Sequence, residues 1–145
     1  MKKFTPPQLF KYLFVTSALL SYFTSFGMNY GSIGAGLVII LAGLWMNWKA
    51  DRLFKQMHTT IKPWLQPTAL VTQCPFSFSR NPMYLGMALV ILAPGVILLT
   101  PVSVLFALAF AMYIAKNYIP LEEDNMTAQF ATEYLEYKAK VRRWI

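Results

Sequence analysis

Hydrophobic residues in this chain are gathered into blocks that alternate with polar and charged segments. The first block covers residues 12–26, and the second covers residues 31–48. Residues 81–115 form a third, much longer stretch that contains no charged residue. Because a membrane-spanning helix needs about 20 apolar residues at roughly 1.5 Å each, the long stretch predicts two helices joined as a hairpin. The pattern therefore predicts four helices that cross a bilayer.

Two pairs of residues divide the uncharged stretch. Thr100 and Pro101 lie near its middle, so we expect the turn of the hairpin there. Pro94 and Gly95 lie closer to its start, and they predict a kink in the third helix rather than its end.

The basic residues predict how the helices are oriented in the membrane. They precede or enter the first predicted helix, lie between the second and third helices, or follow the fourth helix. The connection between the first two helices and the turn of the hairpin contain none. By the positive-inside rule, both termini and the central loop are then cytoplasmic, which requires an even number of spans. The thirteen basic residues are Lys2, Lys3, Lys11, Lys49, Arg52, Lys55, Lys62, Arg80, Lys116, Lys138, Lys140, Arg142 and Arg143.

Two segments differ from the membrane-spanning pattern. Residues 50–79 are polar and interrupted by prolines, which predicts irregular chain on the membrane surface. After Pro120, apolar residues recur at near-helical spacing, which predicts a C-terminal amphipathic helix. We therefore expect one all-α integral membrane domain, a polytopic helical bundle over residues 1–145. Its parts are two spans in 1–49, a cytoplasmic loop in 50–80, the hairpin in 81–118 and a cytoplasmic cap in 119–145.

Composition supports a membrane protein and excludes other classes. The 145 residues are 57% hydrophobic and only 13% charged, whereas soluble domains carry roughly 25% charged residues. The formal charge of +7 could suggest nucleic acid, but the basic residues flank apolar blocks, which predicts contact with anionic membrane lipids instead. The single Cys74 allows no internal disulfide bond and no cysteine-based zinc site.

The hairpin geometry predicts a cluster of polar side chains. If the hairpin folds symmetrically about its turn, Arg80 faces the region of Glu122 and Glu123, and Asn81 and Tyr84 lie at a similar depth. Ionisable residues gathered at a membrane edge suggest a functional site. A salt bridge that only stabilises the hairpin would explain the same residues, so both readings stay open at this point.

Three motifs in the C-terminal part of the chain resemble the isoprenylcysteine carboxyl methyltransferase family. The resemblance covers about the last 85 residues of the sequence. The motifs are 70–76 with Arg80-Asn81-Pro82-Met83-Tyr84, the paired Glu122-Glu123, and the closing Phe130-Ala131-Thr132-Glu133-Tyr134 with Val141-Arg142-Arg143. The family carries glycine where Ala131 stands in the closing motif.

The resemblance implies where cofactor and acceptor would bind. The contacts of S-adenosylmethionine would be Thr68, Ala69, Leu70, Val71, Phe76, Asn81, Pro82, Met83, Tyr84 and Glu122. Lys116, Tyr118 and Glu123 would bind the substrate, Arg80 is the best catalytic candidate, and no metal is expected. The sequence departs from the family at Cys74, where glycine is usual, and at Tyr118, where eukaryotic members carry an arginine linked to the acceptor carboxylate. Asn81 replaces the eukaryotic histidine, as in bacterial-type relatives.

The implied activity is methyl transfer from S-adenosylmethionine to a lipophilic acceptor in the bilayer, with S-adenosylhomocysteine as product. A carboxyl group of the isoprenylcysteine type is one candidate acceptor. Methylating it needs no general base, because it is already ionised near neutral pH. An NADPH-dependent reductase of the related sterol-reductase type and a non-enzymatic membrane scaffold are the alternatives. We expect a bacterial inner membrane protein with its active site at the cytoplasmic face. The acceptor, the organism and the oligomeric state stay open.

Overall fold

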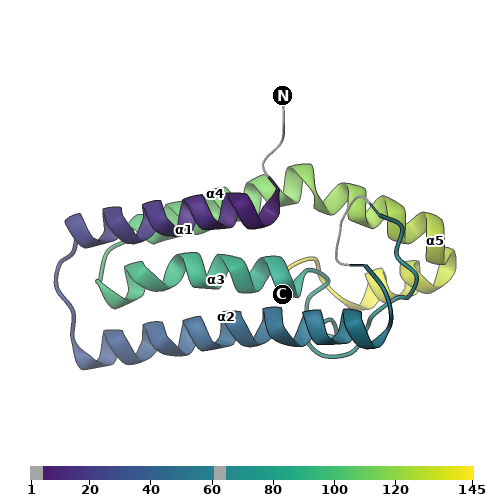
Figure 1. The fold of residues 1–145 in the computed structure, drawn as a ribbon, viewed down its shortest axis with the longest axis horizontal. Helices are drawn as coiled ribbons and strands as arrows, with labels where there is room; N and C mark the ends of the chain where they lie inside the picture. The colour runs from purple at the N-terminus through teal and green to yellow at the C-terminus, as the bar shows by residue number, and fades with distance from the viewer. Residues whose placement is uncertain (1–4, 61–64) are drawn as a thin grey trace.

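The computed structural model describes residues 5–60 and 65–145, and these contain five α-helices and no strand (Figure 1). The helices are α1 (Pro6–Phe23), α2 (Tyr30–Gln56), α3 (Pro82–Ile97), α4 (Val102–Asn117) and α5 (Ile119–Lys140). The first four lie side by side and alternate in direction, and α5 extends beyond one end of this bundle (Figure 1). The all-α prediction is therefore confirmed for the described residues. Lys2, Lys3 and Lys62, which entered the charge pattern, lie outside them.

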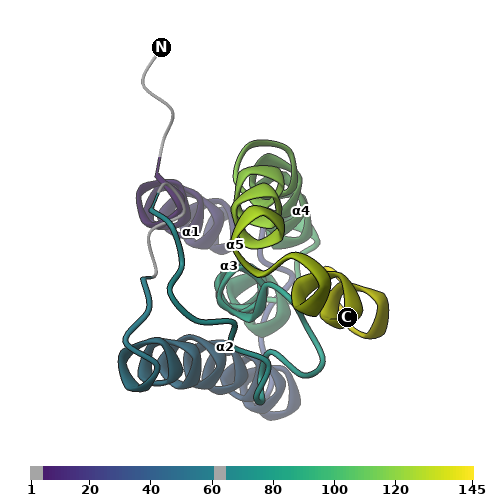
Figure 2. The same ribbon diagram turned by 90° about the vertical axis from the view of Figure 1, so that its right-hand side faces the viewer.

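Helix α3 is the centre of the bundle, because it contacts α1, α2 and α4 (Figure 2). Its backbone approaches α2 closely where Gly43 faces Gly86. A Cβ atom on Gly43 would lie 2.6 Å from the carbonyl oxygen of Gly86. Small residues that let two backbones meet are the usual device for packing helices in a membrane.

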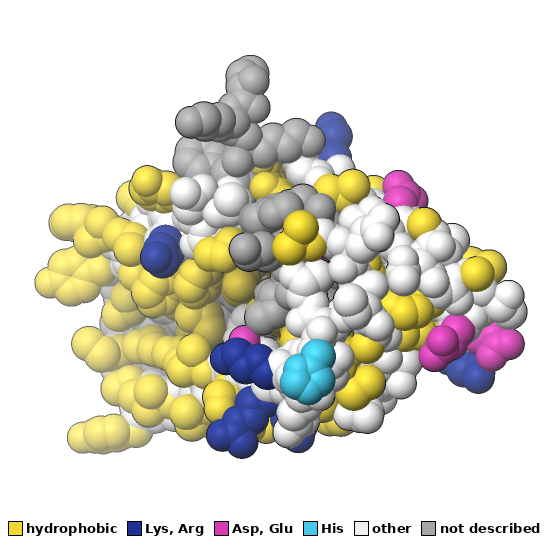
Figure 3. All heavy atoms as spheres, turned by 45° about the vertical axis from the view of Figure 1, so that its right-hand side comes forward, with side chains coloured by type: hydrophobic (Ala, Val, Ile, Leu, Met, Phe, Trp, Pro, Cys, Tyr) yellow, Lys and Arg dark blue, Asp and Glu magenta, His cyan; other side chains and the backbone are white. Residues whose placement is uncertain are grey.

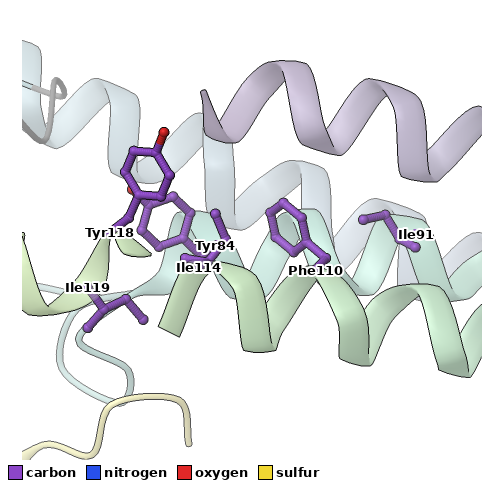
Figure 4. Close-up of a cluster of buried hydrophobic side chains, with 6 residues drawn as sticks. All are labelled: Tyr84, Ile91, Phe110, Ile114, Tyr118 and Ile119. Atoms are coloured by element: carbon purple, nitrogen blue, oxygen red, sulfur yellow. The ribbon is translucent and has the colours of Figure 1, made fainter. Parts of the chain in front are cut away.

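A buried apolar cluster joins the hairpin to the start of α5 (Figure 4). It contains Tyr84, Ile91, Phe110, Ile114, Tyr118 and Ile119. Side chains from α1 and the C-terminal Trp144 pack against it. The cluster therefore fixes the start of α3, the end of α4 and the start of α5 relative to one another.

Buried hydroxyl groups link the helices at the end of the bundle remote from α5. The Ser103 hydroxyl on α4 lies 2.8 Å from that of Ser17 and 2.9 Å from that of Ser21, both on α1. The Ser17 hydroxyl also donates to the Ile91 carbonyl on α3, at 3.2 Å. Such bonds satisfy polar groups that lipid cannot satisfy. Pro94 lies inside α3 and does not end it, as predicted.

The outer surface of the bundle is apolar. Large exposed hydrophobic side chains follow α2 and α4, among them Leu37, Val38, Leu41, Leu105 and Met112. Figure 3 shows hydrophobic side chains over the bundle and most charged side chains toward the end that carries α5. Two helical runs, Tyr30–Gln56 and Val102–Lys140, are long and apolar enough by themselves to cross a bilayer. This surface is that of a membrane protein.

Two elements differ from the expectation. Helix α2 continues to Gln56, whereas the loop was expected to begin at residue 50. The extra turns are held because Ala50 and Leu53 are buried against Val71 and Phe76. Helix α5 begins at Ile119, and Pro120 lies in its first turn, where the missing N–H is not needed. The helix is interrupted at Ala131, whose φ and ψ angles are not helical.

Candidate functional site

A cavity of about 330 Å³ lies at the end of the bundle that carries α5. Its wall is built from the start of α1, the end of α2, the segment before α3, the start of α3, and both halves of α5. The wall is mostly apolar, with a polar part that includes Arg80, Glu122 and Glu123. A concave space with an apolar wall and a few polar groups is typical of small-molecule sites.

Glu122 and Tyr84 form a hydrogen-bonded pair in the cavity wall. The Tyr84 hydroxyl donates to a carboxylate oxygen of Glu122. Tyr84 comes from the first turn of α3 and Glu122 from the first turn of α5, so the pair joins the two ends of the hairpin. Burial raises the pKa of Glu122 to about 7, although the bond from Tyr84 opposes this shift. Glu122 can therefore exchange a proton near neutral pH, and it favours a cationic partner when it is ionised.

Glu123 lies next to this pair and is surrounded by cations. Its carboxylate oxygens lie 3.1 Å from the Arg80 Nη2, 3.1 Å from the Lys138 Nζ and 2.9 Å from the Arg143 Nη2. Burial alone would raise the pKa of Glu123, but hydrogen bonds from Arg143 and Lys138 outweigh it and lower the pKa. Glu123 is therefore ionised in the folded protein near neutral pH.

The C-terminal segment is hydrogen-bonded to the residues at the start of α3. The Arg80 backbone N–H donates to the Arg142 carbonyl at 3.0 Å, and the Asn81 Nδ2 donates to the Arg143 carbonyl at 2.9 Å. In addition, the Tyr137 hydroxyl donates to the Phe76 carbonyl at 2.7 Å. These hydrogen bonds fasten the end of the chain beside the cavity, next to the start of α3.

The apolar wall combines aromatic rings with flexible thioethers. Phe54 and Phe76 meet edge to face with ring centroids 5.3 Å apart, and both line the cavity. Met83, Met87 and Met126 line it as well. Aromatic faces attract cations, and methionine side chains adapt to irregular apolar ligands. The wall therefore suits a ligand that carries both a positive charge and apolar parts.

The structure brings together most of the residues that the sequence predicted. The cavity wall contains Leu70, Val71, Phe76, Arg80, Asn81, Pro82, Met83, Tyr84, Glu122 and Glu123. The predicted meeting of the two hairpin ends is confirmed by the bond between Tyr84 and Glu122 and by the ion pair between Arg80 and Glu123.

Four other predicted residues lie outside the cavity wall. The backbone N–H groups of Thr68 and Ala69 donate to the Thr59 Oγ1, at 3.0 and 3.4 Å. Lys116 is exposed on the last turn of α4, and Tyr118 is buried in the apolar cluster. The hydrogen bonds to Thr59 and the packing of Tyr118 in the apolar cluster account for the positions of Thr68, Ala69 and Tyr118.

Sequence reasoning missed the part of the wall that α1 and α2 supply, and one residue of α3. Pro6 and Pro7 at the start of α1, Phe54 near the end of α2, and Met87 on α3 all line the cavity. No local signal marks these residues, because they reach the site only through the packing of distant helices. Tyr134, which belongs to the closing motif, is buried in the wall.

Comparisons with known proteins identify the family of this chain. The family model for phospholipid methyltransferases matches residues 32–133, which include nearly all of α2, all of α3 and α4, and the first part of α5 with both glutamates. An uncharacterized protein of Haemophilus influenzae is 36% identical over 63 residues, which are 43% of this chain and the full length of that protein. No solved structure matches. The chain therefore belongs to the phospholipid methyltransferase family, a family of membrane methyltransferases that includes the isoprenylcysteine carboxyl methyltransferases.

Proposed function

We propose that this protein transfers a methyl group from S-adenosylmethionine to a lipophilic acceptor dissolved in the bilayer. The observation that carries the proposal is the Glu122 carboxyl, bonded to Tyr84 in the wall of a largely apolar cavity. Family membership supports methyl transfer over the alternatives of a nicotinamide-dependent reductase and a scaffold. When bound, the cofactor supplies an electrophilic methyl group on a sulfonium, and S-adenosylhomocysteine is the product.

The residues present fit the cofactor's chemistry. Ionised Glu122 can pair with the cofactor's ammonium group in a charge-assisted hydrogen bond. The rings of Phe76 and Tyr84 can face its sulfonium, as aromatic rings face other cations. Leu70 and Val71, in the irregular segment before α3, offer apolar surface and backbone groups for the adenosine. Residues of this chain would thus bind and orient the donor and exclude water from it.

The acceptor would use the apolar part of the same cavity. Met83, Met87 and Phe54 lie on the side built by α2 and α3 and can contact a hydrocarbon chain. An acceptor carboxylate, such as that of an isoprenylcysteine-like group, needs no general base, and alignment with exclusion of water would accelerate its methylation. In the membrane arrangement that we propose, α1 to α4 span a bacterial inner membrane and the cavity opens at its cytoplasmic face.

Binding of S-adenosylhomocysteine to the purified protein in a nonionic detergent tests the proposal. We expect isothermal titration to detect binding, and we expect Glu122→Gln to weaken it by about 10- to 100-fold through loss of a charge-assisted bond. Glu136→Gln makes the same change at an exposed position of α5 and should bind like the wild type. Folded wild-type protein that binds neither cofactor nor product would refute the proposed function.

The pH dependence of binding tests the role of Glu122 separately. Because its pKa in the free protein is about 7, the carboxyl is mostly protonated below that pH and must lose a proton to pair with an ammonium group. Affinity should therefore rise from pH 5 to pH 7, by at most about tenfold per pH unit, and then level off. The Glu122→Gln variant should show a flat profile over this range, and an unchanged slope would exclude Glu122 as the ammonium partner.

A further inference from the structure

Glu123 is a buried carboxylate that forms ion pairs with several basic side chains. Its side chain is 10% exposed and forms ion pairs with Arg80, Lys138 and Arg143. The contact with Arg143 is two-pronged, with the Nε at 3.1 Å from one oxygen and the Nη2 at 2.9 Å from the other. Paired and hydrogen-bonded charges of this kind hold a fixed geometry, and removing the one anion leaves several cations without a partner.

The ion pairs connect parts of the chain that a straight helix would keep apart. Glu123 is in the first half of α5, and Lys138 is near its end. In an unbroken helix these two residues would be roughly 22 Å apart along the axis, too far for an ion pair. The break at Ala131, where φ is 41° and ψ is −115°, lets the second half of α5 turn back toward the first. Glu123 therefore holds the segment after Ala131 in its returned position.

The segment that Glu123 holds forms part of the cavity. Tyr134 and Tyr137 lie between Ala131 and the end of α5, and both line the wall. Tyr137 is joined to another part of the wall, because its hydroxyl donates a hydrogen bond to the Phe76 carbonyl. Glu122 is the neighbouring residue in the same helical turn. The ion pairs of Glu123 therefore also fix the orientation of the Glu122 side chain.

We propose that Glu123 is a positioning residue. Its ion pairs hold the segment 132–143 over the cavity and fix the turn that presents Glu122 to Tyr84. This inference rests on the proposed function and refines it, because Glu123 acts through Glu122 and the cavity wall rather than by binding the substrate, the role the sequence suggested.

A positioning role predicts an electrostatic effect on Glu122. The groups that act on Glu122 are Tyr84 from α3 and Glu123 and Tyr134 from α5, and Arg80, which precedes α3 and pairs with Glu123, lines the same cavity. Replacing Glu123 by glutamine removes a like charge that raises the pKa of Glu122, and it leaves the nearby cations uncompensated. Both changes lower the pKa of Glu122, so the rise in cofactor affinity should move to a lower pH.

The test compares Glu123→Gln with the wild type and with Glu136→Gln as the matched exposed control. We expect Glu123→Gln to bind S-adenosylhomocysteine at least about tenfold more weakly at pH 7, with the midpoint of its pH profile displaced downward. Glu123→Asp, which keeps the charge, should retain the wild-type midpoint. In hydrogen exchange, amides of residues 132–143 should exchange faster in Glu123→Gln than in the control.

Two outcomes overturn the inference. One is a Glu123→Gln variant with wild-type affinity and pH midpoint, and the other is unchanged exchange in residues 132–143. If Glu123→Gln does not fold, the Lys138→Met variant tests the inference instead, because it leaves Arg80 and Arg143 paired with Glu123. Hydrogen exchange in residues 132–143 should still be faster in this variant than in the wild type. If the wild type binds no S-adenosylhomocysteine, the proposed function fails, whereas the exchange comparison still tests the anchor by itself.

Discussion

At the scale of single residues, Ala131 is the most informative position in the backbone. Its φ of 41° lies in the left-handed region, where a side chain is disfavoured, and the residue is exposed. Holding a non-glycine residue in such a conformation costs of order 1–3 kcal/mol. The closing motif that this chain resembles has glycine here, which would adopt the same backbone without that cost.

We therefore predict that Ala131→Gly stabilises the folded protein. The gain should be about 1 kcal/mol after the greater flexibility of glycine in the unfolded chain is subtracted. Ala128→Gly is the matched control, because Ala128 is exposed in the helical first half of α5 and the change should cost about 1 kcal/mol there. The midpoint of thermal unfolding in detergent measures both. Equal losses for the two variants would contradict a left-handed Ala131.

Ala131 also separates the part of the site that the sequence could predict from the part that it could not. The contact of Arg80 with Glu123 and that of Tyr84 with Glu122 follow from the depth symmetry of the hairpin, which needs only the turn at Thr100 and Pro101. The approach of Lys138 and Arg143 to Glu123 depends on the break at Ala131. The apolar spacing along this segment continues across the break, so nothing in the pattern revealed it.

At the scale of elements, hydropathy located the helices but not all of their ends. Helix α2 runs past residue 50 through Asp51, Arg52 and Lys55, which read as a loop because they are charged. A helix that leaves the bilayer can continue in water, where its charged side chains are solvated and its inner face packs on protein. Ala50 and Leu53 supply that face, and their partners Val71 and Phe76 lie too far along the chain for a local pattern to reveal them.

Packing of α2 on α3 makes a sharp prediction about two glycines. We expect Gly43→Ala to destabilise the fold by about 1–3 kcal/mol or more, since its Cβ would meet the Gly86 carbonyl oxygen at 2.6 Å and backbone cannot yield easily. Gly34→Ala is the matched control on the same helix, because a Cβ there meets nothing within 4 Å. Thermal unfolding in detergent should separate the two variants, and similar midpoints would argue against the close contact of α2 with α3.

At the scale of the whole molecule, the distribution of charge gives the bundle two different ends. The end that carries the cavity holds Glu122, Glu123 and their cationic neighbours, whereas the opposite end is joined by hydroxyl groups such as Ser103 and Thr100. A water-soluble methyl donor and a bilayer-dissolved acceptor can meet only where the two solvents meet. The cavity at the charged end of an apolar bundle satisfies this condition, provided that the charged end faces the cytoplasm.

That orientation can be tested with the chain's single cysteine. Cys74 is exposed at the cavity end, and Phe26, at 82% exposure, lies in the connection between α1 and α2 at the other end. With the protein in a bacterial inner membrane, a membrane-impermeant maleimide should label Cys74 in inverted vesicles but not in intact spheroplasts. The double variant Cys74→Ala/Phe26→Cys should show the reverse, and Cys74→Ala alone should stay unlabelled. Because four spans with cytoplasmic termini place these two positions on opposite sides, labelling of both from one side would contradict the arrangement.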